Sequence, residues 1–466
     1  MASFIFNSCF IYLCIVFSLL RCEGVHAFEG RKIAENNEHL LQLQLNDLLP
    51  SHACKLSTTV GENATSMKVV HKHGPCSQLS ENVAAPNLLE TLIQDQARVD
   101  SINSKILWSS DQSDVRETDA TKLPATSGVS LGTGNYVVTV GFGTPMKKLP
   151  LIFDTGSDLT WTRCTSRDQF NPIRSKSYFN VSCSSRLCSS VTTATGNSPK
   201  CTSSTCVYGI EYGDGSYSIG FLAKEKLSLG SVDTFENFYF GCGQDNDGLF
   251  GDAAGLIGLG RAKLSIVSQT ETKYKKLFSY CIPSSSSTGF LNFGASISKT
   301  AKFTPLSTKS SASSFYDLDL IGITVGGKTL SIPPSVFSTA GTIIDSGTVI
   351  TRLPPSAYSA LRSTFRAAMS RYPLTKALSI LDTCYDFSKF KTINVPKILL
   401  SFNGGTKLAV DVQGVFISNG VQQVCLAFAG NNDGREKGII GNTQQKNYEV
   451  IYDVGRGKVG FAPGAC

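Results

Sequence analysis

The stretch LIFDTGSDLTW, residues 151–161, is an apolar run that ends abruptly in an acid, a hydroxyl residue and a glycine. The chain repeats this pattern in TIIDSGTVITRL, residues 342–353, where Asp345 corresponds to Asp154. A short apolar run of this kind predicts a buried β-strand, and the glycine two residues after each acid permits a tight turn. Each stretch therefore predicts a strand that delivers one carboxyl group to a turn.

Small and hydroxyl-bearing residues surround both acids. Hydroxyl side chains can hydrogen-bond to a carboxylate and to the backbone, so they can hold an acid in a fixed orientation. The expected supporting residues are Thr155, Gly156, Ser157, Ser346, Gly347 and Thr348.

A second element recurs downstream of each acid. GLIGLG at residues 255–260 follows Asp154, and GIIGN at 438–442 follows Asp345 at a nearly equal separation. Two elements that recur in the same order indicate duplicated lobes. Each lobe is then expected to contribute one acid to a shared site.

The remainder of the chain from residue 123 reads as mainly β. Alternating apolar runs such as FYDLDLIGITV, residues 315–325, are separated by Gly, Asn, Ser and Pro. One amphipathic helix is predicted in residues 354–372, after a proline-marked start. With 466 residues, of which 41% are apolar and 17% charged, the chain has the composition of a globular protein.

Residues 1–27 are predicted to be a secretory signal peptide. FIYLCIVFSLL, residues 10–20, is a short apolar core, and residues 25–27 offer a small-residue cleavage site. A membrane anchor is the alternative, but it needs about 20 apolar residues and meets Arg21 and Glu23 too early. No other apolar run is long enough to span a bilayer.

Residues 28–122 are predicted to be a propeptide. Apolar residues at helical spacing between residues 88 and 106 predict a helix, and Asn87 with Glu90 forms a capping box. The polar stretch at 109–122 reads as a cleavable linker. An ordinary amphipathic domain helix is the alternative interpretation.

Charge and histidine divide the chain at the same place. Residues 1–122 hold 10 Lys and Arg against 14 Asp and Glu, whereas the rest holds 33 against 22, and all five histidines precede residue 123. Without imidazole, the body cannot use a Ser/His/Asp or Cys/His nucleophile or a histidine-bound catalytic zinc. Its chemistry must come from carboxylates, Lys, Tyr or thiols.

Ten cysteines lie from Cys164 onward. An even number behind a secretory signal predicts five disulfides, with the connectivity open from counting alone. A zinc site is the alternative for the cluster of four, but their spacings of five, thirteen and five residues do not match usual zinc motifs. These four are Cys183, Cys188, Cys201 and Cys206.

Residues 128–466 resemble the pepsin-like aspartic proteases. The resemblance rests on NYVVTVGFGTP, DTGSDLTW, DSGT, LIGLG and IIGN, and GCGQDNDGLF, VITRLPPSAY and VGFAPGAC are most similar to the plant nepenthesin-like branch, which includes chloroplast-nucleoid relatives. It implies a mainly β, bilobal fold with lobes at 123–305 and 306–466 and the active-site cleft between them. IEYGDGS matches the family's flap, which implies that Tyr212, Gly213 and Asp214 cover the cleft beside Trp161.

The resemblance makes Asp154 and Asp345 a catalytic pair. Two carboxyl groups about 3 Å apart cannot both ionise, so they share one proton. The ionised partner takes a proton from a water molecule, which attacks the scissile carbonyl while the protonated partner donates to the carbonyl oxygen. This chemistry needs no metal and no cofactor.

The disulfides implied by the resemblance are Cys164–Cys242, Cys183–Cys206, Cys188–Cys201, Cys281–Cys466 and Cys384–Cys425. The cysteine-rich segment that relatives carry after Cys164 is absent here, which makes Cys164–Cys242 the remaining pair. Asn63 and Asn180 lie in N-glycosylation triplets.

The sequence thus predicts a secretory-pathway aspartic endopeptidase, made as a zymogen and active at acidic pH. We expect polypeptide substrates, the propeptide as an intramolecular inhibitor that loosens in acid as His71 and His73 gain charge, and a monomer. The expected location is extracellular, in the apoplast, with vacuole and plastid as alternatives. The rival interpretations are an inactive protease-like binding or inhibitor protein and a protease that also binds DNA, although the basic residues are scattered and match no nucleic-acid motif.

Overall fold

The computed structural model describes most of the chain from His39 onward. The described ranges are 39–48, 53–56, 66–79, 87–111, 136–165, 169–212, 215–248, 250, 252–284, 286–294, 297–308 and 314–466. The predicted signal peptide and linker residues 112–122 lie outside these ranges, as do Asn63, Gly213 and Asp214.

The two predicted acid strands occupy equivalent places in two halves of the fold. β4 (Lys147–Asp154) runs parallel to β11 (Gly255–Gly258), with Asp154 opposite Gly258. β18 (Thr342–Ile344) runs parallel to β28 (Gly438–Ile440) and ends one residue before Asp345. The parallel pairing of each acid strand with its downstream partner explains why the two sequence elements recur together.

A fifteen-stranded sheet contains the first acid strand and reaches into the C-terminal part of the chain. Its other strands are β2 (Met67–His71), β3 (Tyr136–Phe142), β5 (Trp161–Arg163), β6 (Phe179–Asn180), β7 (Lys200–Thr202), β8 (Thr205–Glu211), β9 (Tyr217–Leu229), β10 (Asp233–Asp247), β12 (Leu277–Cys281), β13 (Thr288–Phe293), β14 (Lys302–Pro305), β29 (Tyr448–Asp453) and β30 (Lys458–Pro463).

Strand β2 comes from the predicted propeptide yet lies inside this sheet. It pairs antiparallel with β13 on one side and with β3 on the other. Met67 and Val69 are buried in the main apolar core, and a disulfide joins Cys54 to Cys76 in the same segment. The leader is therefore built into the described fold.

Smaller sheets form the half that contains Asp345. A five-stranded sheet holds β18 and β28 with β15 (Tyr316–Leu318), β19 (Thr351–Leu353) and β27 (Phe428–Gly430). Two four-stranded sheets comprise β16 (Leu320–Val325), β17 (Lys328–Thr329), β23 (Ile398–Phe402) and β24 (Lys407–Ala409), and β20 (Leu374–Thr375), β21 (Cys384–Tyr385), β25 (Phe416–Ser418) and β26 (Val424–Leu426). A leader strand, β1 (Leu40–Gln44), pairs with β22 (Thr392–Pro396).

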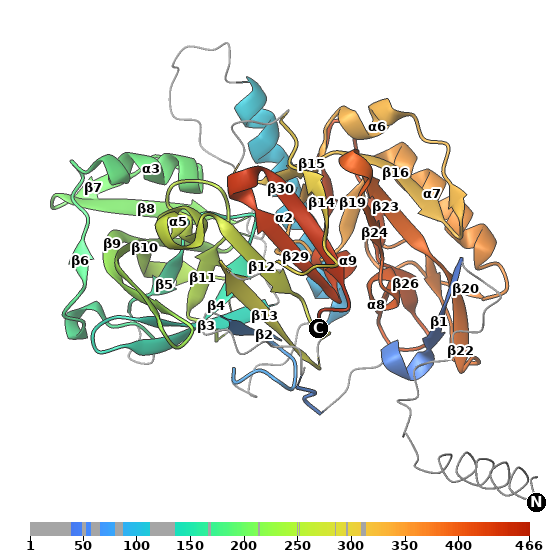
Figure 1. The fold of residues 1–466 in the computed structure, drawn as a ribbon, viewed down its shortest axis with the longest axis horizontal. Helices are drawn as coiled ribbons and strands as arrows, with labels where there is room; N and C mark the ends of the chain where they lie inside the picture. The colour runs from blue at the N-terminus through green and yellow to red at the C-terminus, as the bar shows by residue number, and fades with distance from the viewer. Residues whose placement is uncertain are drawn as a thin grey trace, which may run out of the picture. The chain divides into compact units, whose positions relative to one another are not determined.

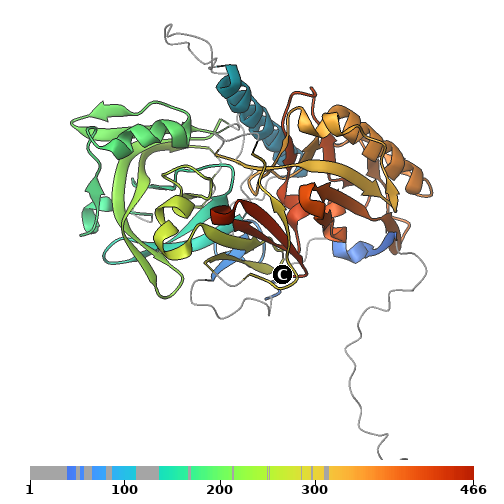
Figure 2. The same cartoon turned by 45° about the horizontal axis from the view of Figure 1, so that its top comes forward.

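Helices are few, as predicted, and the longest comes from the leader. α2 (Leu88–Asp111) lies between the green and orange halves in both ribbon views (Figures 1 and 2). The predicted capping box is present, because Asn87 and Glu90 each accept a hydrogen bond from the other's backbone N–H. The other helices are α3 (Arg186–Thr195), α4 (Ile266–Gln269), α5 (Glu271–Tyr274), α6 (Pro334–Ser338), α7 (Pro355–Ala368), α8 (Val412–Val415) and α9 (Asn442–Gln445), with 3-10 turns η1 (Leu45–Leu48), η2 (Pro172–Arg174), η3 (Asn403–Gly405) and η4 (Val454–Arg456).

Two of the predicted disulfides are wrong. The structure joins Cys183 to Cys201 and Cys188 to Cys206, whereas the resemblance implied Cys183–Cys206 and Cys188–Cys201. Cys188 lies on the buried face of α3 and Cys206 is fully buried in β8, so these two sulfurs meet in the core. The more exposed Cys183 and Cys201 are left to pair at the surface.

The other three predicted pairs are present in the structure. They are Cys164–Cys242, Cys281–Cys466 and Cys384–Cys425.

Candidate active site

Asp154 and Asp345 lie beside each other, both almost completely buried. The backbone fixes each one to its downstream element: Leu259 N–H donates to the Asp154 carbonyl at 2.8 Å, and Asp345 N–H donates to the Ile440 carbonyl at 3.1 Å. The duplicated glycine-bearing strands therefore hold the two acid turns in place.

Thr155 and Ser346 link the two acid turns directly. Thr155 N–H donates to Ser346 Oγ at 3.1 Å, and Ser346 N–H donates to Thr155 Oγ1 at 2.9 Å. The two hydroxyl oxygens are 3.3 Å apart. These reciprocal bonds bring residues that are 191 positions apart in the chain into one rigid unit.

Each carboxylate also accepts hydrogen bonds within its own turn. Gly156 N–H donates to Asp154 Oδ1 at 2.9 Å, and Gly347 N–H donates to Asp345 Oδ1 at 3.1 Å. Thr348 adds a hydroxyl bond to Asp345 Oδ2 at 2.6 Å. Ser157, the residue that corresponds to Thr348, is buried beside Asp154.

The two glycines are needed for space. A Cβ atom at Gly156 would lie 2.7 Å from Asp345 Oδ1, and one at Gly347 would lie 2.5 Å from Asp154 Oδ1. Neither glycine adopts the left-handed backbone conformation. Each glycine was predicted from the turn that it permits; in the structure each also admits the opposite carboxylate and the Arg98 guanidinium.

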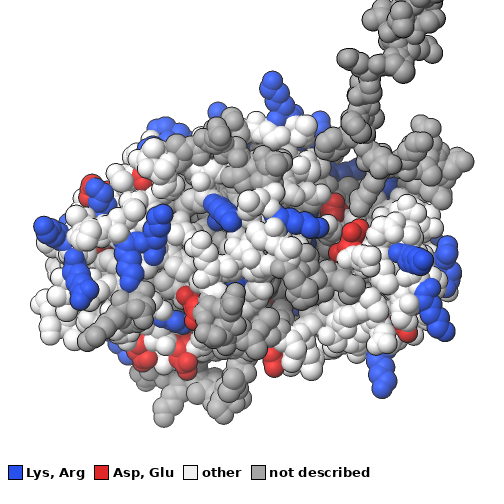
Figure 3. Space-filling view, turned by 90° about the horizontal axis from the view of Figure 1, so that it is seen from below, with Lys and Arg blue, Asp and Glu red and all other residues white. Residues whose placement is uncertain are grey.

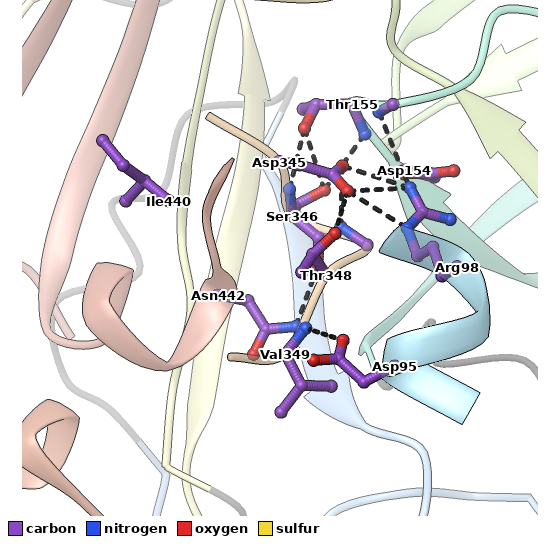
Figure 4. A network of polar contacts seen from close by, with 12 residues as sticks. Asp95, Arg98, Asp154, Thr155, Asp345, Ser346, Thr348, Val349, Ile440 and Asn442 are labelled. Carbon is purple, nitrogen blue, oxygen red and sulfur yellow. Dashed lines mark hydrogen bonds and ion pairs between the residues drawn. The ribbon is translucent and has the colours of Figure 1, made fainter. Parts of the chain in front are cut away.

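Arg98 of α2 occupies the space between the two acids (Figure 4). Its Nη2 lies 2.8 Å from Asp154 Oδ1 and 2.9 Å from Asp345 Oδ2, and its Nε donates to Asp345 Oδ2 at 3.1 Å. The guanidinium thus bridges both carboxylates through a single nitrogen. No sequence pattern marks Arg98 as part of the site.

The environment shifts the pKa values of the two acids in opposite directions. Burial raises the pKa of Asp154. Burial also acts on Asp345, but the Arg98 charge and the Thr348 and Gly347 hydrogen bonds overcome it and lower the pKa of Asp345. The negative charge of the pair is therefore favoured on Asp345 over Asp154.

A second polar contact lies one helical turn away from Arg98. Asp95 accepts backbone hydrogen bonds from Val349 at 2.6 Å and Ile350 at 3.0 Å, and it forms an ion pair with Arg352 at 3.0 Å. Both charged side chains are fully buried. Sequence reasoning also missed this contact, because nothing local marks two residues that are over 250 positions apart as partners.

Tyr212, the predicted flap tyrosine, and Trp161 meet in the other half of the site. Trp161 Nε1 donates to Tyr212 Oη at 2.7 Å, and both rings contact Phe250 edge-on. Asn180, the described glycosylation candidate, is exposed in β6.

Other kinds of site find no support in the described ranges. These residues contain no group of three or more His, Cys, Asp or Glu side chains placed to hold a metal ion. The four cysteines considered for zinc are joined in disulfides. Within the same ranges, each helix is too short or too polar to cross a membrane.

Comparisons with known proteins agree with this geometry. Residues 136–295 match the family described as xylanase inhibitor N-terminal, and residues 315–463 match xylanase inhibitor C-terminal. An aspartyl protease family protein of Arabidopsis thaliana is 52% identical over 97% of this chain and 98% of its own length. Aspartic proteinase nepenthesin-1 of Nepenthes gracilis is 36% identical over 72% of this chain and 79% of its own.

Solved structures show the same fold at lower identity. The crystal structure of edgp superposes with a TM-score of 0.60 at 22% identity, covering 70% of this chain and 91% of that one. Basic 7S globulin from soybean gives 0.58 at 22% identity, covering 70% and 92%. The duplicated acid turns, the mainly β bilobal fold and these relatives lead to one conclusion: the chain belongs to the pepsin-like aspartic proteases of plants and is an aspartic-type endopeptidase.

Proposed function

We propose that this chain is the zymogen of an acid-active endopeptidase of the secretory pathway, whose catalytic groups are Asp154 and Asp345. The observation that carries the proposal is the single Arg98 nitrogen bonded to both carboxylates. A group that can bind both acids at once lies where a water molecule would have to lie to be shared between them. Arg98 thus marks the reaction centre and blocks it.

With Arg98 withdrawn, the chemistry follows from one shared proton. The ionised carboxylate removes a proton from the water as its oxygen attacks the scissile carbonyl carbon, and the protonated carboxyl donates its proton to the carbonyl oxygen. The resulting tetrahedral diol collapses as the C–N bond breaks: the carboxyl group that took the water proton gives it to the leaving amine, and one diol hydroxyl returns its proton to the other carboxylate. The reciprocal Thr155–Ser346 bonds keep both carboxylates in place through these steps.

The flap completes the site. Tyr212 lies on the described edge of the YGDGS segment and is held by Trp161, so we propose that this hairpin closes over bound peptide. Gly213 and Asp214 belong to the same proposed flap. Closure excludes water and strengthens the electrostatic interactions at the acids.

The leader serves as an intramolecular inhibitor in this proposal. It contacts the body through β1, β2 and α2, of which α2 reaches the acids. Disulfides in both the leader and the body suit an oxidising compartment, which supports the secretory route and an extracellular location. Basic side chains are spread over the face that Figure 3 shows.

The test is proteolysis of a denatured protein substrate at pH 3 to 7, by the matured protein with and without pepstatin. Asp154→Asn and Asp345→Asn should each lower the rate by at least about 10²–10⁴-fold, since each removes one acid–base partner. Thr195→Val, a buried hydroxyl outside the site, is the control. Well-folded, matured protein that cleaves nothing would instead favour a binding or inhibitor protein.

A further inference from the structure

The contact between Asp95 and the body has the properties of a ligand site. On the body side it consists of two backbone N–H groups, from Val349 and Ile350, and the guanidinium of Arg352. All three groups point at one carboxylate, as Figure 4 shows for Val349. A fixed cation with convergent N–H donors is a typical arrangement for binding a carboxylate.

Arg352 is held in place by the body itself. Its Nη1 donates to the Ile350 carbonyl at 2.8 Å, which orients the guanidinium whether or not the leader is present. Among the described residues, Asp95 is its only acidic partner, and its Nε has no hydrogen-bond partner. The other side chain that contacts it, Gln96, also belongs to α2.

Loss of the leader would therefore leave the Arg352 guanidinium without its acidic partner. In the zymogen α2 itself covers part of the site, because Leu92 of α2 belongs to the apolar cluster that borders it. Val349, Ile350 and Leu381 of the body belong to the same cluster. The freed site keeps a fixed cation and two backbone N–H donors for an incoming carboxylate.

The site also lies at the correct distance to contact substrate. Asp95 and Arg98 are three residues apart on one helix, so their Cβ atoms are separated by about 5–6 Å. A substrate in extended conformation advances about 3.3 Å per residue, so the site is about two residues from the scissile bond. Arg98 marks the position of that bond in the zymogen.

We propose that Val349, Ile350 and Arg352 form a subsite that selects substrates with an Asp or Glu side chain within three residues of the cleaved bond. In the zymogen, Asp95 fills this subsite in place of substrate. The inference rests on the proposed function, because it requires that the leader is released and that the cleft then receives peptides.

The test compares peptides that differ only by Glu or Gln at one position, scanned through the residues on both sides of the cleaved bond. The enzyme is obtained from full chains that carry a site-specific protease sequence within residues 112–135, cut and freed of the leader at acid pH. At pH 5 we expect one position where kcat/KM is about tenfold higher for Glu than for Gln, the size expected for one charged hydrogen bond. The ratio should fall towards 1 at pH 3, because the substrate carboxylate is then protonated and resembles the neutral Gln amide.

Two variants isolate Arg352. Asp95→Asn/Arg352→Gln avoids an unpaired buried carboxylate in the zymogen, and it should reduce the Glu/Gln ratio to about 1 at pH 5. Asp95→Asn alone is the matched control, because its matured enzyme has the wild-type body and should keep the wild-type ratio. If the double variant does not fold, Arg352→Lys should lower the ratio to a few-fold, since it keeps the charge but loses the forked geometry.

The outcomes separate the two proposals. A Glu/Gln ratio near 1 at every position, or a ratio unchanged in the Arg352 variant, overturns the subsite while leaving the peptidase intact. If no peptide is cleaved, the proposed function fails, and a binding measurement then tests whether the subsite recognises a carboxylate. In that case a synthetic peptide of residues 87–106 should bind the freed body about tenfold more tightly than its Asp95→Asn twin, and equal binding overturns the inference.

Discussion

The turn that carries Asp154 and the turn that carries Asp345 share a scaffold but differ in the residue seven positions after each acid. Thr160 and Thr351 each accept a hydrogen bond from the glycine of the downstream element, Gly258 and Gly441. The next residue is Trp161 in the first turn and Arg352 in the second, and both are completely buried.

Each of these two residues bonds to a different covering element. Trp161 donates to Tyr212 of the proposed flap, whereas Arg352 pairs with Asp95 of the leader helix. Arg98 likewise makes more bonds to Asp345 than to Asp154. The duplicated turns thus keep the residues that position the acids and differ in the residues that contact the covering elements. The first turn supports the proposed flap, and the second holds the leader helix.

The largest expected effect is the loss of latency when Arg98 is removed. Arg98→Ala leaves two buried carboxylates without their cation, which should weaken leader docking by about 3–5 kcal/mol. The full, unprocessed chain should then cleave a small fluorogenic peptide at pH 5, where wild type is silent. Asp100→Ala, which removes an exposed charge that bonds only within the same helix, is the control, and equal latency in all three chains would contradict the role of Arg98.

Because the two turns share this scaffold, equivalent substitutions in them should lower the free energy of unfolding by similar amounts. Thr155→Val and Ser346→Ala each leave the other turn's backbone N–H without its acceptor, so each should lower the free energy of unfolding by about 1–3 kcal/mol. Urea denaturation of the two variants measures this. If one variant is much less stable than the other, the turns are not equivalent in holding the acids.

The pH dependence of leader release should distinguish the attachment through strand β2 from the attachment through helix α2. His71 ends β2, its Nδ1 accepts a bond from His73 N–H, and burial lowers its pKa to about 3, so the docked form favours neutral His71. The contribution of neutral His71 to the free energy of leader docking is complete above pH 6.5 and is lost as the pH falls towards 3. Because His71 is partly exposed to water, we expect this contribution to be about 1–2 kcal/mol.

Asp345 acts in a lower pH range. Its pKa is lowered in the docked form, so its contribution is present above about pH 3.9 and is lost below that value. In urea titrations of leader release, His71→Asn should flatten the curve between pH 6.5 and 3, and Asp345→Asn should flatten it only below about pH 4. Identical curves for both variants would mean that the two attachments are not independent.

The smallest effect concerns the flap side of the comparison. Trp161→Phe and Tyr212→Phe each remove the same hydrogen bond, worth about 0.5–1.5 kcal/mol, so kcat/KM should fall by up to about tenfold. The double variant should be no worse than either single variant, because only one bond is lost. Additive losses would show that the two residues act separately.

The sequence predicted the parts of the site that repeat or that follow local rules. The two acid turns were found because the pattern occurs twice, and α2 was found from its spacing and its capping box. Arg98, Asp95 and Arg352 were missed because their partners lie far along the chain and single charged residues carry no local signal. The disulfide error has the same origin, since only the packing of α3 on β8 determines which cysteines face the core.

The position of β2 has a consequence for producing the enzyme. A gene shortened to begin at residue 136 would encode β3 and β13 without the strand that separates them in the sheet. While the chain folds, strand edges without their partner are templates for association with other chains, so a product that never had the leader should accumulate as inclusion bodies, unlike enzyme that folded with the leader and lost it afterwards. Co-expression of residues 39–111 as a separate polypeptide should restore soluble yield, and equal yields with and without it would show that the leader is dispensable for folding. In this respect the leader would act as a folding chaperone encoded in the same gene as its client.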